Sequence, residues 1–205
     1  RAQLTGVLGD LGAPATLREA RRRDAAMASD PQAVPAALRK SILAVVAAHA
    51  DAPTWDALRA AARAEASPLV RDTMYGLLAT ANDPAMAARA LALAITGEPG
   101  ETIGAEMIST VAETHPDLAF DFALANMAAV NERIDASSRS RFFPALARGS
   151  SDPDMVGKVR RYAEANLAPE ARRDAETAVA AIQDRLKVRG ERVPEIDGWL
   201  KRKGM

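Results

Sequence analysis

Two histidines, His49 and His115, are the residues of this sequence best suited to metal binding or acid–base chemistry. A helical zinc hydrolase needs the pattern H-E-x-x-H, in which two histidines one turn apart bind the metal beside a glutamate base. Here the histidines are far apart and neither is followed by glutamate. His49 precedes residues 50–53, which close a helix, so we predict a helix-end residue near the free carbonyl groups. His115 stands before Pro116 and is typical of a surface turn.

The other patterns that support catalysis are also missing from the sequence. There is no cysteine, which excludes disulfides, thiolate metal sites and a cysteine nucleophile. Gly6, Gly9 and Gly12 are spaced three apart, unlike a dinucleotide-binding loop, and indicate a frayed first helix and its exit. No G-x-S-x-G nucleophile elbow occurs. Asp117 and Asp121 lie one helical turn apart, a spacing that usually reflects a solvated surface. We therefore assign no catalytic, cofactor-binding or metal-binding residue to this chain.

The overall charge balance argues against a nucleic-acid partner. Lysine plus arginine equals aspartate plus glutamate at 27 each, whereas nucleic-acid binders carry a basic excess that neutralises phosphates. Two basic clusters stand out, at residues 18–23 and 201–203. We interpret the first as a solvated helix face paired with acids such as Glu19 and Asp24. Both clusters are candidate docking patches.

The distribution of charge along the chain is uneven. Residues 80–135 hold nine acidic and two basic residues, a net charge of −7, and residues 155–205 hold twelve basic and eight acidic ones, a net charge of +4. An acidic middle would attract cations, including the amino termini of peptides. Salt would screen this attraction beyond about 10 Å.

The composition of the chain and the positions of its prolines indicate helices. Hydrophobic residues make up 48% of the sequence and aromatic residues only 4%, with much alanine, the best helix former. No alternating apolar run suggests a strand. At many predicted boundaries a proline follows a residue that can cap a helix, or a residue that caps less well. Proline is favoured at the first helical position, where its missing N–H costs no hydrogen bond. These predicted starts are Asp30-Pro31, Ala52-Pro53, Ser67-Pro68, Asp83-Pro84, His115-Pro116, Asp152-Pro153 and Ala168-Pro169, with an obvious turn at residues 97–100.

These signals predict an all-α protein of about eleven helices joined by short loops. Helical hairpins in series, each unable to bury its apolar face alone, form an α-solenoid. We expect one domain over residues 1–205, an irregular armadillo/HEAT-like superhelix of antiparallel hairpins, with a compact helical bundle as the alternative. No apolar run approaches the roughly 20 residues that span a bilayer, so we expect no membrane partner. The chain begins at Arg1 without methionine, which favours a C-terminal piece of a larger protein. The compartment of that protein, cytoplasmic or exported, is left open.

An ordered set of short segments resembles the C-terminal helical domain of zinc aminopeptidases, the group of the puromycin-sensitive, endoplasmic-reticulum and glutamyl enzymes. That domain typically has a tryptophan–x–x–leucine helix followed by a leucine-rich helix that ends before Asp-Pro. Met127 stands where the family has tryptophan. The segments that carry the resemblance are residues 53–58, 66–71, 77–84, 118–127, 141–146 and the Trp-Leu of 196–200.

The resemblance implies a cup of helices that encloses a substrate chamber over the catalytic domain of the same polypeptide. In that family the zinc ligands and the glutamate base lie upstream, so no catalytic or zinc-binding residue is carried over to this chain. The expected partners are the upstream catalytic domain and peptide substrates, and zinc is expected only in the parent enzyme. A free α-solenoid scaffold for protein binding is the alternative function, and a helical-repeat protein acting on nucleic acid is a third.

The missing catalytic patterns give a direct prediction. The purified chain, incubated with zinc, should release no chromophore from aminoacyl nitroanilide substrates, because it offers neither a metal site nor a nucleophile. Chelator-sensitive hydrolysis by a homogeneous, zinc-loaded sample would contradict this prediction.

Overall fold

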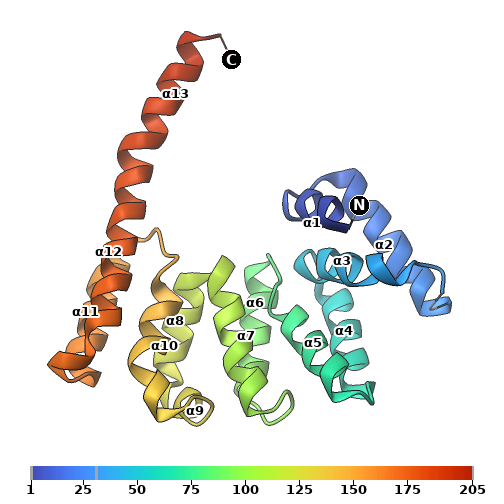
Figure 1. The fold of residues 1–205 in the computed structure, drawn as a ribbon, viewed down its shortest axis with the longest axis horizontal. Helices are drawn as coiled ribbons and strands as arrows, with labels where there is room; N and C mark the ends of the chain where they lie inside the picture. Colours follow the sequence, from blue (N-terminus) through green and yellow to red (C-terminus); the bar gives the residue numbers. More distant parts are fainter. Residues whose placement is uncertain (1, 31, 205) are drawn as a thin grey trace. The chain divides into compact units, whose positions relative to one another are not determined.

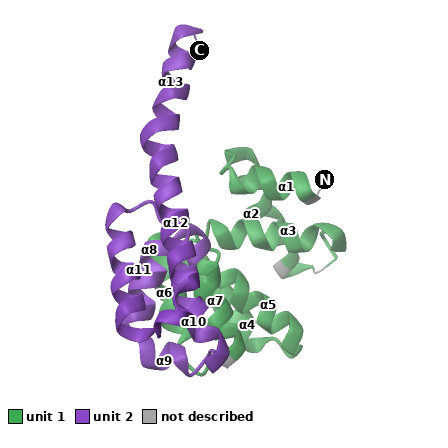
Figure 2. Ribbon diagram, turned by 60° about the vertical axis from the view of Figure 1, so that its left-hand side comes forward, with its two compact units in different colours: residues 1–111 green, residues 112–205 purple. Residues whose placement is uncertain are grey.

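The computed structural model describes residues 2–30 and 32–204, and every regular element in these ranges is helical (Figure 1). The all-α prediction is therefore confirmed. The chain divides into two compact units, residues 1–111 and 112–205, which are described separately (Figure 2). One domain over residues 1–205 and an armadillo/HEAT-like superhelix stay predictions. Among the described helices, none combines the length and the apolar character that a membrane crossing requires.

Unit 1 is built of short helices that pack in pairs. α1 and α2 both lie against α3, α3 contacts α5, and α4 packs along α5. The helices are α1 (Ala2–Asp10), α2 (Pro14–Ser29), α3 (Ala36–Ala48), α4 (Ala52–Ala64), α5 (Pro68–Leu78), α6 (Pro84–Ala94) and the first part of α7 (Glu101–Thr114).

Unit 2 contains the remaining helices and ends in a long helical segment. α10 packs against both α8 and α12, and α11 packs along α12. The elements are the last residues of α7, then α8 (Pro116–Ala125), α9 (Met127–Asn131), η1 (Ala136–Ser138), α10 (Arg139–Ala147), α11 (Pro153–Asn166), η2 (Pro169–Ala171), α12 (Arg173–Lys187), η3 (Val188–Arg192) and α13 (Val193–Arg202).

Most of the predicted helix starts are confirmed, and two of the predicted capping residues make a capping bond. Asp83 accepts a hydrogen bond from the Ala85 amide at the start of α6, and Asp152 accepts one from the Asp154 amide at the start of α11. These bonds satisfy amides that have no partner inside the helix. At α4 the cap is Asp51, one residue earlier than the predicted start. α5 and α8 also begin at their predicted prolines, and residues 97–100 form the expected turn.

Two of the predicted helix starts were wrong in detail. Asp30 ends α2 instead of starting a helix, and α3 begins only at Ala36; Pro31 itself lies outside the described residues. Ala168-Pro169 opens a short 3-10 turn before α12. In α5 the apolar side chain of Leu69 is 78% exposed, whereas Tyr75 and Leu78 are buried in the core. A run of neighbouring apolar residues leaves the buried face of a helix ambiguous.

The core of unit 1 combines a few large side chains with many alanines. Trp55, Tyr75 and Leu78 are fully buried, and alanines on α4 and α6 are completely enclosed. Small side chains let the backbones of neighbouring helices approach closely. In unit 2 an aromatic cluster takes the corresponding role: the ring of Tyr162 stacks on Phe143 with centroids 5.0 Å apart, and it meets Phe120 edge-on at 6.3 Å. Burial raises the pKa of Tyr162 to about 12.

One glycine in α1 marks a close helix contact. A Cβ atom added to Gly9 would lie 2.3 Å from Cγ2 of Val45 on α3. Val45 is a short branched side chain, so it cannot swing away from such a contact. Gly9 is therefore set by packing between α1 and α3, and the frayed helix expected here is an ordinary α-helix over residues 2–10.

This contact predicts opposite effects for two substitutions in α1. Gly9→Ala should lower the free energy of unfolding by about 1–3 kcal/mol, because the added methyl overpacks the contact with Val45. Gly6→Ala is the matched control: no atom lies within 4 Å of its added Cβ, and the helix should gain about 0.5–1 kcal/mol. Urea unfolding followed by circular dichroism measures both, and equal effects of the two changes would refute the packing role.

Candidate functional site

The two histidines occupy helix ends, as the sequence predicted for His49. His49 is the C-cap residue of α3, and its Nε2 donates to the Gly9 carbonyl oxygen at 2.9 Å. The His49 carbonyl in turn accepts a hydrogen bond from Arg21 at 3.2 Å. The imidazole of His49 thus joins α3 to α1, and the backbone carbonyl of the same residue joins α3 to α2. His115 is half-buried at the N-cap position of α8.

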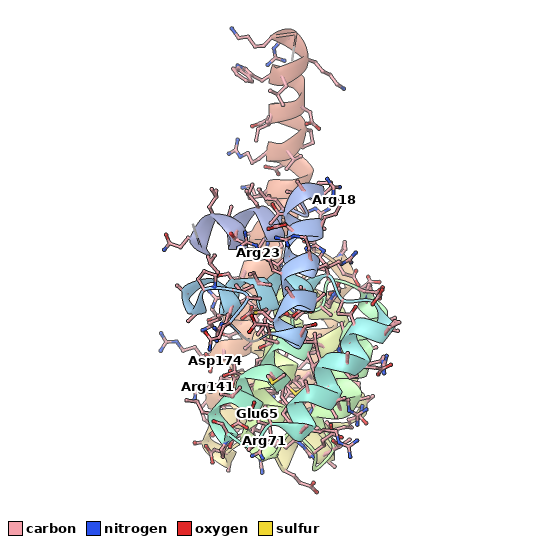
Figure 3. All side chains as sticks on the ribbon, turned by 90° about the vertical axis from the view of Figure 1, so that its right-hand side faces the viewer. Arg18, Arg23, Glu65, Arg71, Arg141 and Asp174 are labelled. Carbon is pink, nitrogen blue, oxygen red and sulfur yellow. The ribbon has the colours of Figure 1, made fainter. Side chains whose placement is uncertain are left out.

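The basic cluster of α2 is largely engaged by one acid of the same helix. Arg22 and Arg23 contact the Glu19 carboxylate at 2.8 and 2.7 Å, and their hydrogen bonds lower the pKa of Glu19 to about 2. Figure 3 labels Arg18 and Arg23 on this helix. The interpretation as a paired, solvated face is confirmed for Glu19.

An ion pair that the sequence did not indicate links α4 to the turn after α6. Arg59 binds the Glu98 carboxylate through two parallel hydrogen bonds of 2.9 and 2.6 Å, a geometry that fixes both side chains. The hydroxyl of buried Tyr75 donates to the same carboxylate at 3.3 Å. The hydrogen bonds from Arg59 lower the pKa of Glu98, and burial raises that of Tyr75.

A second cluster surrounds the indole of Trp55. Its Nε1 donates to the Leu78 carbonyl oxygen at 3.1 Å, and the guanidinium of Arg89 lies 4.3 Å from the ring centroid. Arg89 also pairs with Asp56. A cation over an aromatic face is attracted by the ring quadrupole. The cluster ties α4, α5 and α6 together.

The two carboxylates of α8, Asp117 and Asp121, make separate contacts with other segments of unit 2. Ser150 donates to Asp117 and accepts from the Asp152 amide at 3.0 Å. Lys158 binds Asp121 at 2.7 Å, and these hydrogen bonds raise the pKa of the lysine. Ser150 is 0% exposed, so no substrate can reach its hydroxyl. These carboxylates therefore hold α8 to the segment that starts α11.

Several acidic side chains of residues 80–135 take part in these internal contacts. Asp83 caps α6, Glu98 pairs with Arg59, and the two aspartates of α8 have the partners described above. The acidic surface expected from the sequence is therefore smaller than its net charge suggested. The acidic side chains of this stretch that are exposed among those described are Glu106, Glu113, Asp121, Glu132 and Asp135, with Asp83 beside its cap.

The clusters around Glu98 and Trp55 were missed because their partners are distant in sequence. Arg59 and Glu98 are separated by 39 residues and Asp56 and Arg89 by 33. In the sequence these clusters are marked only by Glu98, a single acid in the turn at residues 97–100, and by Arg89, a single charged residue on an apolar helix. Each arrangement joins side chains from separate helices or turns and can orient them.

Comparison with known proteins places the chain beside one described family. Residues 1–184 match the family described as the ERAP1-like C-terminal domain. Among the curated proteins, none matches the chain. The matched part covers both units up to α12 and leaves residues 185–205 outside.

The Arg59–Glu98 pair predicts a pH-dependent contribution to stability. Glu98→Gln should lower the free energy of unfolding at pH 7 by about 1 kcal/mol, a modest value because Arg59 is 35% exposed to screening solvent. Because the pKa of Glu98 is lowered in the folded state, the stabilisation is present above its unfolded value, about 4.3, and is lost as pH falls below it.

Urea titrations of the wild type and Glu98→Gln between pH 3 and pH 7 test this dependence. The difference in stability should shrink as the pH drops below about 4. Glu106→Gln, at an exposed position of α7, is the matched control and should change little at either pH. A constant difference at every pH would contradict the role given to Glu98.

Proposed function

This chain belongs to the ERAP1-like C-terminal domain family, the helical C-terminal domains of aminopeptidases, and we propose that it encloses the substrate chamber of a zinc aminopeptidase. In this proposal it gates the access of peptides to a catalytic domain that lies upstream in the same polypeptide. The observation that carries the proposal is the family match over residues 1–184. Closure of one domain over another excludes water and selects substrates by size.

The joints inside each unit support a role as a wall. Helices that line a chamber must keep their spacing when substrate enters. The two-pronged Arg59–Glu98 contact, the Trp55 cluster and the Asp117–Ser150 joint each connect helices that come from separate parts of the chain. Such contacts order neighbouring helices without contributing chemistry of their own.

The proposal assigns no zinc site to this chain. Among the side chains that the structure describes, no three of histidine, aspartate or glutamate lie together as metal ligands would. The proposal therefore places the zinc and the glutamate base in the upstream domain and gives this chain no step in peptide hydrolysis. When bound upstream, zinc would polarise the scissile carbonyl and activate water.

The exposed acids provide the proposed means of attracting peptides. Glu106, Glu113, Glu132 and Asp135 are exposed negative groups, and the amino terminus of a peptide is positive. Their attraction would raise the local concentration of substrate at low salt and fade with added salt. A free scaffold, the other function considered, is not favoured by the family match.

Deleting residues 1–205 from the parent enzyme tests the chamber role. The zinc-loaded parent should hydrolyse peptides with a marked dependence on their length, and the deletion should flatten that dependence while a single aminoacyl nitroanilide is still cleaved. The quantity to compare is kcat/KM across a series of peptides of increasing length. Identical length profiles for the two proteins would contradict the proposal.

A second variant keeps the domain in place in case the deletion does not fold. Replacing Glu106, Glu113, Glu132 and Asp135 by their amides in the full polypeptide should raise KM for peptides at low salt with little change in kcat. The matched control is Glu191→Gln, an acid outside the acidic middle. Unchanged KM for every peptide would remove the role given to these acids.

A further inference from the structure

The last helix of unit 2 presents an apolar side that nothing in unit 2 covers. Figure 2 shows α13 extending past the other helices of its unit. None of its residues is buried, and Val193, Ile196 and Trp199 are 44%, 55% and 48% exposed. With half-buried Leu200 they form one side of the helix, here called the α13 stripe. Large apolar side chains at this exposure favour any arrangement that removes them from water.

The sequence that joins α12 to α13 contains the signals of a helix end followed by a helix start. Arg185 and Lys187 stand in the last turn of α12, where cations interact well with the free carbonyls, and Gly190 follows. Pro194 and Glu195 then stand in the first turn of α13, the preferred place for proline and for acids.

In the structure the helix nevertheless does not end at these residues. It continues from α12 to α13 through a π-helical segment, η3. Single π turns are rare and often mark functional positions in helices. Gly190 lies in the middle of this segment, and its backbone can adopt the left-handed conformation that ends a helix. Residues 188–192 are therefore long enough to serve as the loop of a helical hairpin.

A groove runs between α11 and α12 of the same unit, with a small apolar floor and a polar rim of Arg160, Glu164, Arg172, Glu176 and Gln183. Its volume is about 420 Å³, and its floor consists of the buried side chains of Ala163, Ala175 and Val179. Small residues on the floor let another helix approach closely. Ala180 and Glu176 stand exposed along its α12 side.

In a hairpin whose loop is residues 188–192, the α13 stripe would lie opposite the groove between α11 and α12. Since helices rise by about 1.5 Å per residue, positions equally far from Gly190 lie side by side in an antiparallel pair. Leu200 then lies level with Ala180, and Lys203 comes within a turn of Glu176. No ion pair joins Glu176 to a cation within the part of the chain that the structure describes. Apolar and charged groups thus match in the same register.

We propose that α13 folds back at residues 188–192 and docks its stripe in the α11–α12 groove of the same chain. The docked helix caps the C-terminal end of unit 2, and the straight arrangement is the open form of the same hinge. The occupant of the groove is therefore this chain's own last helix. The hinge and α13 lie beyond the family match, and the inference does not depend on the proposed function.

Because the chain has no cysteine, a pair of introduced cysteines tests the docking cleanly. In the full chain, Ala180→Cys combined with Leu200→Cys should form a disulfide within one chain under mild oxidation. Ala180→Cys with Gly198→Cys is the matched control, since residue 198 lies on the opposite side of α13, and it should cross-link several-fold less. Non-reducing electrophoresis and mass spectrometry measure the yield.

Two outcomes would overturn the proposal. Equal cross-linking of both cysteine pairs would show that α13 moves freely and has no fixed docking site. Cross-links formed only between chains would show that the α13 stripe packs on a second copy of the chain.

Fluorescence quenching gives an independent readout. Trp55 is 1% exposed, so acrylamide reports on Trp199. Gly190→Ala should increase the quenching and lower the Ala180–Leu200 cross-link yield several-fold, because alanine favours the continuous helix and resists the left-handed turn. Gly198→Ala, in the middle of α13, is the control that should change neither. Unaltered quenching in Gly190→Ala would contradict the hinge.

Discussion

The structure of both units depends on the close approach of short helices through small side chains. A helix of about 12 residues is only marginally stable alone in water, so each one needs a neighbour that covers its apolar side. Here that cover is supplied largely by alanine: Ala62, Ala87 and Ala90 in unit 1 and Ala119 and Ala147 in unit 2 are completely enclosed. Close contact between these faces leaves no room for larger side chains.

Polar groups enter this packing mainly as joints between helices. Glu98 joins the turn after α6 to α4, Asp117 joins α8 to the residues before α11, and His49 joins the first three helices. Each is a residue type that elsewhere performs chemistry, and each is occupied here by a partner that fixes the backbone. These contacts show how charged residues contribute to the packing of helices in this chain.

The sequence predicted those features whose cause is local. Helix starts at Asp83 and Asp152 follow from a carboxylate and a proline within two residues. The partner of Glu98 could not be predicted, because it depends on how α4 and the turn after α6 meet in space. Asp30 misled for a related reason: a capping residue can end one helix as well as begin another, and only the following residues decide which.

We propose that this domain accompanies an aminopeptidase catalytic centre in the same polypeptide. Sequencing the parent polypeptide upstream of Arg1 tests this pairing. We expect an H-E-x-x-H helix there, followed by a glutamate that completes the zinc site. An upstream sequence without that motif would contradict the proposed function, whatever the fold of this domain.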